Sequence, residues 1–288
     1  MRIVRTISCA LLAILLLPAA LLAGRGDELV HASLVADVSA IQPGESFRLG
    51  VAVKIDPSWH IYWKNPGDSG LPTRVKLDLP AGFTAGEVQF PVPRKLTLPG
   101  DIVNYGYEDQ TMLIVPVSVA KDVAIGSTAN LKAKISWLVC QEMCLPGKAD
   151  VEITLPVAAQ AQPVNREAFD QWSKQMPERD AREYVDEPWL VRSGNRQFEF
   201  KLSWKRVVTD VDWWPGNNDP LTVRGVKVQT RDGATLLSFG VQAVDVPHPP
   251  DLVRSLLVFT LDGQRHAAKL NIPLPKGWAA AEASSVSK

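Results

Sequence analysis

The residues of this chain whose types and spacing best fit a chemical role are two cysteines four positions apart, Cys140 and Cys144. Thiol–disulfide exchange needs an attacking thiolate, an accessible sulfur and a second thiol that resolves the mixed disulfide. The three residues between these cysteines allow a disulfide if the segment turns, and Pro146 and Gly147 just beyond favour a turn. The pair is therefore a candidate for reversible redox chemistry.

Two other roles fit the same pair. A structural bridge is one, although closing about five residues stabilises by only about 2 kcal/mol, against about 4 kcal/mol for a bridge between distant strands. Soft Cu(I) ligation with Met143 is the other, but no histidine lies close in sequence to complete such a site. We expect no metal and no small-molecule cofactor, and the structural bridge remains the main alternative.

The N-terminus is typical of a secretory signal peptide. Arg2 and Arg5 precede an apolar run over residues 7–23, which is short for a membrane span. We expect a signal peptide over residues 1–23, with cleavage after Ala23 or as late as Ala32. The mature protein is then expected to be soluble in the periplasm, where disulfides form and persist.

Signal removal leaves a single cysteine pair. Cys9 is the third and last cysteine of the chain and lies within the expected signal peptide. An even cysteine count in an oxidising compartment predicts that Cys140 and Cys144 are oxidised to each other.

Charge and composition exclude several functions. The 31 basic and 31 acidic residues balance, so the chain has no overall charge to attract nucleic acid or an anionic membrane. No Ser-His-Asp arrangement or paired catalytic carboxylate stands out. The 22 prolines disfavour long helices and favour short strands joined by turns.

The hydrophobic pattern predicts an all-β protein with two β-rich units. Alternating segments bounded by turn signals recur about every ten residues, the spacing of an immunoglobulin-like β-sandwich. In the first unit the expected strands are residues 33–41, 47–55, 75–79, 112–119, 129–139 and 149–155. In the second they are residues 198–202, 221–228, 236–244, 256–261 and 267–272, with Asp-Gly hairpin turns at Asp232 and Asp262.

Composition suggests the boundaries between the units. We expect a first domain over residues 32–157, a linker with a short helix over 158–195, a second sandwich-like domain over 196–278 and a flexible tail over 279–288. Asn165 is expected to cap the helix, and the charged residues 178–186 to be solvated. The adjacent Trp213 and Trp214 are expected to form an interdomain contact.

Three segments together resemble a known family. Residues 59–73, which contain His60 and Tyr62, residues 105–107 with the following strand, and the cysteine segment 140–147 are similar to the N-terminal periplasmic domain of DsbD and ScsB proteins. The resemblance covers roughly residues 32–156. The second β unit resembles, more weakly, the extra domain of ScsB-type proteins.

The resemblance implies a function. Family members have an immunoglobulin-like fold and paired cysteines that receive electrons from a membrane-embedded DsbD/CcdA-like donor. They pass these electrons to periplasmic thioredoxin-fold clients, such as disulfide isomerases and the thiol reductases of cytochrome c biogenesis. This chain ends without the membrane and thioredoxin domains, so a separately encoded membrane partner is expected.

The resemblance also implies a cap over the disulfide. The matching loop covers residues 101–108, and Tyr105, Asp101 and Glu108 are the candidate cap residues. His60 and Tyr62 are candidates for tuning the cysteine pKa. The cysteine spacing is shorter than in classical DsbD, and the classical cap residues are not matched at positions 102–104.

Overall fold

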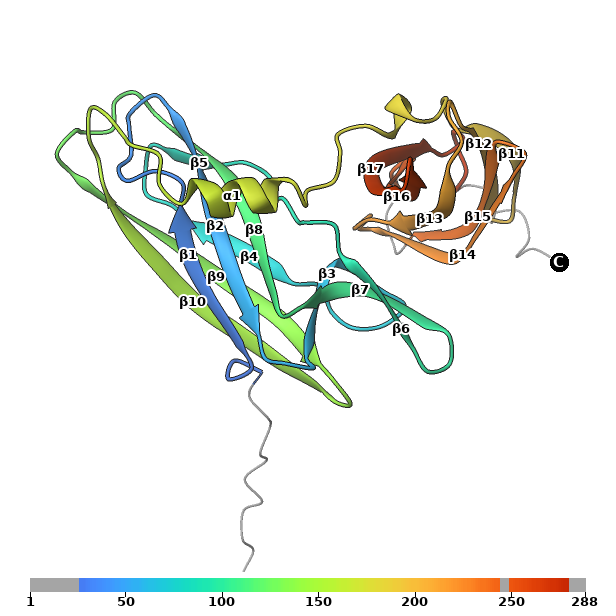
Figure 1. The fold of residues 1–288 in the computed structure, drawn as a ribbon, viewed down its shortest axis with the longest axis horizontal. Coiled ribbons are helices and arrows are strands. Elements are labelled where there is room, and N and C mark those ends of the chain that lie inside the picture. The colour runs from blue at the N-terminus through green and yellow to red at the C-terminus, as the bar shows by residue number, and fades with distance from the viewer. Residues whose placement is uncertain (1–25, 244–248, 280–288) are drawn as a thin grey trace, which may run out of the picture.

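The computed structural model describes residues 26–243 and 249–279, which form two β-sandwiches side by side (Figure 1). The expected signal peptide with Cys9, and residues 280–288 of the expected tail, lie outside the described residues. The all-β, immunoglobulin-like prediction is confirmed.

The first sandwich packs a sheet of order β1-β2-β8-β5 against one of order β10-β9-β3-β7-β6, to which β4 adds by pairing with β9. The strands are β1 (Val30–Ala36), β2 (Ser46–Ile55), β3 (His60–Gly67), β4 (Arg74–Asp78), β5 (Phe83–Ala85), β6 (Arg94–Leu98), β7 (Ile102–Glu108), β8 (Gln110–Val119), β9 (Thr128–Cys140) and β10 (Cys144–Pro156). Strict alternation in β9 places Leu131, Ile135 and Val139 in the core opposite Val53 and Leu113.

The second sandwich packs a sheet of order β11-β12-β15-β14 against one of order β13-β16-β17. Its strands are β11 (Trp189–Gly194), β12 (Gln197–Ser203), β13 (Thr209–Pro215), β14 (Leu221–Arg231), β15 (Ala234–Ala243), β16 (Leu252–Leu261) and β17 (Gln264–Pro273). Asp232 and Asp262 have positive φ, as do the glycines that follow them, so both expected Asp-Gly hairpin turns are present.

Residues 158–195 do not behave as a simple linker. The helix α1 (Arg166–Ser173) buries Phe169 against Met112 and Ile114 of the first sandwich. The 3₁₀ turn η1 (Ala181–Glu183), in the segment expected to be solvated, buries Ala181 in the second core. The second sandwich also begins earlier than expected, because β11 precedes residue 196.

Asn165 does not cap α1 with its side chain, contrary to the prediction. Its backbone is left-handed, and its Nδ2 donates to the carbonyl of Ala36, 2.9 Å away. The side chain therefore ties the helix to β1, an interaction between segments far apart in the sequence.

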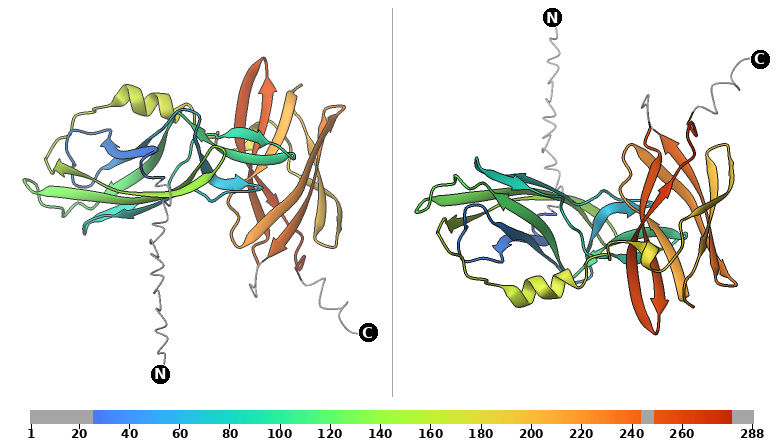
Figure 2. Two further views of the ribbon diagram at one scale, coloured as in Figure 1. Left: turned by 90° about the horizontal axis from the view of Figure 1, so that it is seen from below. Right: turned by 90° about the horizontal axis from the view of Figure 1, so that it is seen from above.

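The strands β3, β6 and β7 reach toward the second sandwich (Figure 2). Lys95 Nζ lies 2.6 Å from the carboxylate of Asp212, and Asn65 Nδ2 donates to the carbonyl of Pro215 at 2.6 Å. Trp214 packs against Tyr105, with ring centroids 5.2 Å apart, which confirms the expected interdomain contact for this tryptophan. Trp213 instead belongs to the core of the second sandwich.

Candidate functional site

The cysteines close the hairpin between β9 and β10. Cys140 ends β9, Cys144 begins β10, and a disulfide joins them with an S–S distance of 2.06 Å. The turn consists of the residues between them, and Pro146 and Gly147 lie in β10, not in a turn as expected. Gly147 has a different role, because a Cβ there would lie 2.3 Å from the indole nitrogen of Trp137.

The two halves of the disulfide differ in exposure. Cys140 is 2% exposed, whereas Cys144 is an exposed residue at the surface of the hairpin. An incoming thiolate must reach a sulfur along the S–S axis, so access favours attack at Cys144. Cys140 is then the leaving sulfur, and its immediate surroundings determine how well it carries negative charge.

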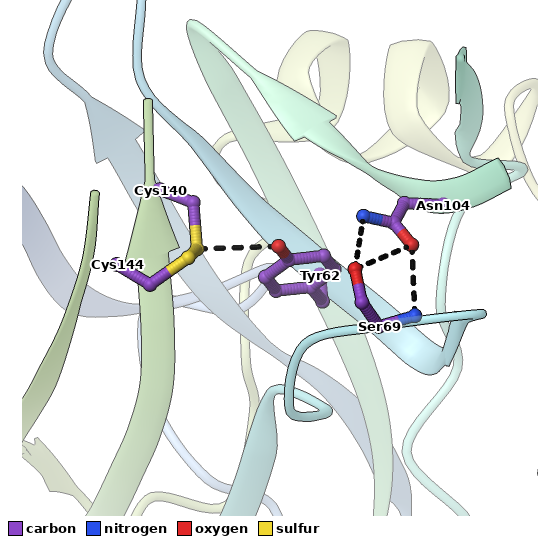
Figure 3. Close-up of a disulfide and its surroundings, with 5 residues drawn as sticks. All are labelled: Tyr62, Ser69, Asn104, Cys140 and Cys144. Atoms are coloured by element: carbon purple, nitrogen blue, oxygen red, sulfur yellow. Dashed lines mark hydrogen bonds between the residues drawn. A yellow bond between two sulfur atoms is a disulfide. The ribbon is translucent and has the colours of Figure 1, made fainter. Parts of the chain in front are cut away.

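Tyr62 supplies a hydrogen bond to this leaving sulfur. Its hydroxyl donates to Cys140 Sγ at 3.2 Å, from a side chain that is 2% exposed (Figure 3). Burial raises the pKa of Tyr62, so the hydroxyl keeps its proton at neutral pH and remains a donor. The position follows from the sheet, because β3 pairs with the end of β9 and sets His60 opposite Cys140.

His60 packs beside Tyr62 and not against solvent. The two rings are edge to face, with centroids 5.2 Å apart. Burial lowers the pKa of His60, and Glu108 opposes this shift. Its Nε2 is buried and has no hydrogen-bond partner among the described residues. The ring is therefore neutral at pH 7 and packs against the ring of Tyr62.

The loop after β3 covers the ring of Tyr62. Gly70 lies so close that a Cβ there would be 2.4 Å from Cζ of Tyr62, and its φ is +93°. The adjacent Ser69 is held by Asn104 of β7, which is fully buried: Asn104 Oδ1 accepts from Ser69 N at 3.1 Å, and its Nδ2 donates to Ser69 Oγ at 3.0 Å. Figure 3 shows Tyr62 between the disulfide and this pair.

Two of the three expected cap residues, Tyr105 and Asp101, lie away from the disulfide. Residues 102–108 form strand β7, and β3 lies between β7 and the cysteine strand β9. Tyr105 is 7% exposed and packs against Trp63 and Trp214, so its ring belongs to the core and the interdomain contact. Asp101 is exposed in the turn before β7.

Glu108 is the expected cap residue that the structure brings toward the site. It pairs in register with His60, and its carboxylate lies 2.6 Å from Arg94.

Sequence reasoning missed Ser69, Gly70 and Asn104. Ser69 and Gly70 lie within the family-like segment 59–73, but that resemblance assigned them no role. The described residues contain no group of three or more His, Cys, Asp or Glu side chains that could hold a metal ion. Within the same residues, no helix is long and apolar enough to cross a membrane.

Comparisons with known proteins concern the family of the first sandwich and the fold of the chain. Residues 27–156 match the family model "Thiol:disulfide interchange protein DsbD, N-terminal". The chain is similar in structure to the N-terminal periplasmic domain of ScsB from Proteus mirabilis, with 14% identity, 85% of this chain and 92% of that chain covered, and a TM-score of 0.59. It also aligns with the Neisseria meningitidis DsbD N-terminal domain in the reduced form, with 18% identity, coverage of 46% and 90%, and a TM-score of 0.27.

No curated protein matches the chain. The likeness to the ScsB domain shows the fold, and the family match supports a role in thiol–disulfide interchange.

Proposed function

We propose that the protein, whose residues 27–156 match the DsbD N-terminal family model, relays reducing equivalents in the periplasm. It takes them from a membrane-embedded DsbD/CcdA-like donor and passes them to thioredoxin-fold clients, including those of cytochrome c biogenesis. The Cys140–Cys144 pair carries the electrons, and the reaction needs no bound cofactor.

The uptake step begins at the exposed sulfur. A donor thiolate attacks Cys144 Sγ, the S–S bond breaks, and Cys140 leaves as a thiolate that accepts the hydrogen bond from Tyr62. The donor's second thiolate then attacks the donor sulfur of the mixed disulfide and releases Cys144. The donor ends as a disulfide and the carrier as a dithiol, so two electrons have moved.

The delivery step reverses these roles. The Cys144 thiolate attacks one sulfur of the client disulfide and frees the client's other sulfur as a thiolate. Cys140 then attacks Cys144 Sγ, which restores the internal disulfide and releases the reduced client. Burial of Cys140 keeps it from competing with Cys144 for partners, so one cysteine exchanges and the other resolves.

The observation that carries the proposal is the unequal exposure of the two cysteines, combined with a hydroxyl donor aimed at the buried sulfur. A bridge that serves only stability needs neither feature. Trapping of mixed disulfides in the periplasm tests whether Cys144 is the cysteine that exchanges with partners. The Cys140→Ala variant keeps the exposed thiol and should accumulate mixed disulfides with thioredoxin-fold proteins, whereas the matched Cys144→Ala variant should accumulate far fewer.

Equal trapping by both variants would contradict the assignment of Cys144. The absence of mixed disulfides from both, with a wild-type disulfide that reforms only after unfolding, would instead establish a structural bridge in a non-catalytic binding module.

A further inference from the structure

A cleft of about 1410 Å³ lies between the two sandwiches, away from the disulfide. One wall comes from β3, β4, β9 and β10 of the first sandwich, and the other from β16, β17 and the residues after β13. The volume exceeds the roughly 300–1,000 Å³ of ordinary small-molecule pockets. The cleft is therefore large enough for an extended segment of chain.

The cleft is strongly basic although the whole chain has equal numbers of acidic and basic residues. Eight lysine and arginine side chains line it, against three carboxylates. Among the described residues, Glu87 is the carboxylate that forms an ion pair with one of these cations, at 3.8 Å from Lys64 Nζ. Most of the lysine and arginine side chains that line the cleft therefore form no ion pair with a described residue.

On the first wall, like charges face each other across the sheet. Lys76 of β4 lies directly opposite Lys134 of β9, whose other neighbour in the same row is Asp150 of β10. In the next row, Arg74 and Lys148 flank Ser136. All four cations are exposed. Like charges opposite each other destabilise a sheet, so the Lys76–Lys134 pair has an energetic cost. Asp150 offsets part of this cost, and a bound anion would relieve more of it.

Cations of the second wall approach from the other sandwich. Burial lowers the pKa of Lys64, Glu87 raises it, and the positive charges of Lys269 and Arg254 lower it further. Lys64 belongs to β3, whereas Arg254 and Lys269 belong to β16 and β17. The electrostatic field of the cleft is therefore built jointly by both sandwiches.

We propose that this cleft binds an extended acidic polypeptide segment of a partner protein. The cations are spread over seven strands and loops of both sandwiches and do not surround one point, which suits a chain of carboxylates better than a single small anion. Apolar side chains, among them Val75, Phe90 and Leu256, also line the cleft and can contact the methylene groups of the acidic side chains in such a segment. Thr73 lies on its wall, and the buried Thr73 Oγ1 has no hydrogen-bond partner among the described residues.

The test measures fluorescence anisotropy of a fluorescein-labelled oligoglutamate peptide with the full mature protein. We expect saturable binding that weakens as sodium chloride is raised, because the attraction is screened. The triple variant Lys64→Gln, Arg254→Gln, Lys269→Gln should bind about tenfold more weakly, since each lost cation removes a favourable contact. The reduction of the disulfide by dithiothreitol should not change, because these residues lie outside the cysteine site.

The matched control removes the same charge elsewhere. Lys121→Gln, Lys227→Gln, Arg231→Gln changes two lysines and one arginine that are exposed and do not line the cleft. Its affinity should stay within about twofold of wild type. An equal loss in both triple variants would show unspecific charge attraction and overturn the proposal.

Two further arms identify the ligand class. Inorganic phosphate, added so that its negative charges equal those of the peptide in concentration, should not displace the peptide. Displacement would overturn the polypeptide assignment in favour of a small anion. A single-stranded oligonucleotide that binds more tightly than the peptide would likewise overturn it. If the cleft triple variant does not fold, the single variant Lys269→Gln provides the comparison, and unchanged affinity there contradicts the proposal.

Discussion

The hydroxyl of Tyr62 lies 3.2 Å from Sγ of Cys140 and donates a hydrogen bond to it. This contact joins the middle of the sheet to the end of β9, across 78 positions of sequence. It places a neutral donor at the sulfur that leaves as a thiolate in the mechanism we propose, and it leads to the first prediction.

Tyr62→Phe should slow reduction of the disulfide by dithiothreitol. The ring remains, but the leaving Cys140 thiolate loses a hydrogen bond of about 1 kcal/mol, which corresponds to roughly fivefold in rate. Stopped-flow kinetics measure this. Tyr107→Phe is the control, because it also removes a buried hydroxyl, one that donates to Pro91 O at 2.7 Å, and should leave the rate unchanged. Equal rates for wild type and Tyr62→Phe would show that the contact has no part in exchange.

Gly70→Ala should expose the site. The new Cβ would meet the Tyr62 ring at 2.4 Å, so the loop or the ring has to move, and alkylation of the reduced cysteines should become faster. Gly100→Ala is a matched control, since Gly100 has φ +83° but nothing within 4 Å of its Cβ position. Both variants carry backbone strain of about 1 kcal/mol, and Gly70→Ala alone should change alkylation. Similar alkylation rates in the two variants would contradict a covering role for this loop.

Tyr105→Ala should destabilise the protein by about 3–5 kcal/mol, because a buried aromatic ring leaves a cavity between Trp63 and Trp214. Alkylation of the reduced pair should be unchanged in the folded protein. Chemical denaturation and thiol labelling measure the two quantities. Faster alkylation with little loss of stability would restore the lid expected from the sequence.

Reduction of the disulfide should leave the fold intact. The bridge closes about five residues, so its loss costs at most about 2 kcal/mol of unfolding free energy. Denaturation curves of oxidised and reduced protein give this difference. Loss of a cooperative transition on reduction would favour a structural bridge.

Stability should fall as pH drops below the ordinary histidine pKa of 6.5, in part through His60. Burial lowers the pKa of His60 in the folded state, with Glu108 opposing the shift, so the unfolded chain binds a proton that the folded protein does not. The contribution is therefore complete above pH 6.5 and is lost as pH falls toward the lower folded value. Comparing the pH dependence of unfolding for wild type and His60→Gln measures it, and the variant should show a flatter slope.

The sequence by itself determined the fold class and the cysteine pair, and it indicated that the first sandwich resembles the DsbD N-terminal family. Period-two alternation in segments such as β9 and the Asp-Gly turns at Asp232 and Asp262 are local properties, so they can be read without tertiary information. The pairing of Cys140 with Cys144 likewise followed from cysteine count and spacing. The interdomain role of Trp214 was also predicted, from adjacent aromatics on a turn.

Only the tertiary structure decided which residues surround the disulfide. The sheet order places β3 between β9 and β7, so Tyr62 reaches Cys140 while Tyr105, the expected cap, turns into the core. The same order lets Asn104 hold the loop that carries Gly70. The basic cleft arises in the same way, from lysines and arginines of both sandwiches in a chain with equal numbers of basic and acidic residues. Strand order and the contact between the sandwiches bring together residues that are far apart in the chain. Local sequence patterns predict individual strands, but they do not predict which distant strands become neighbours.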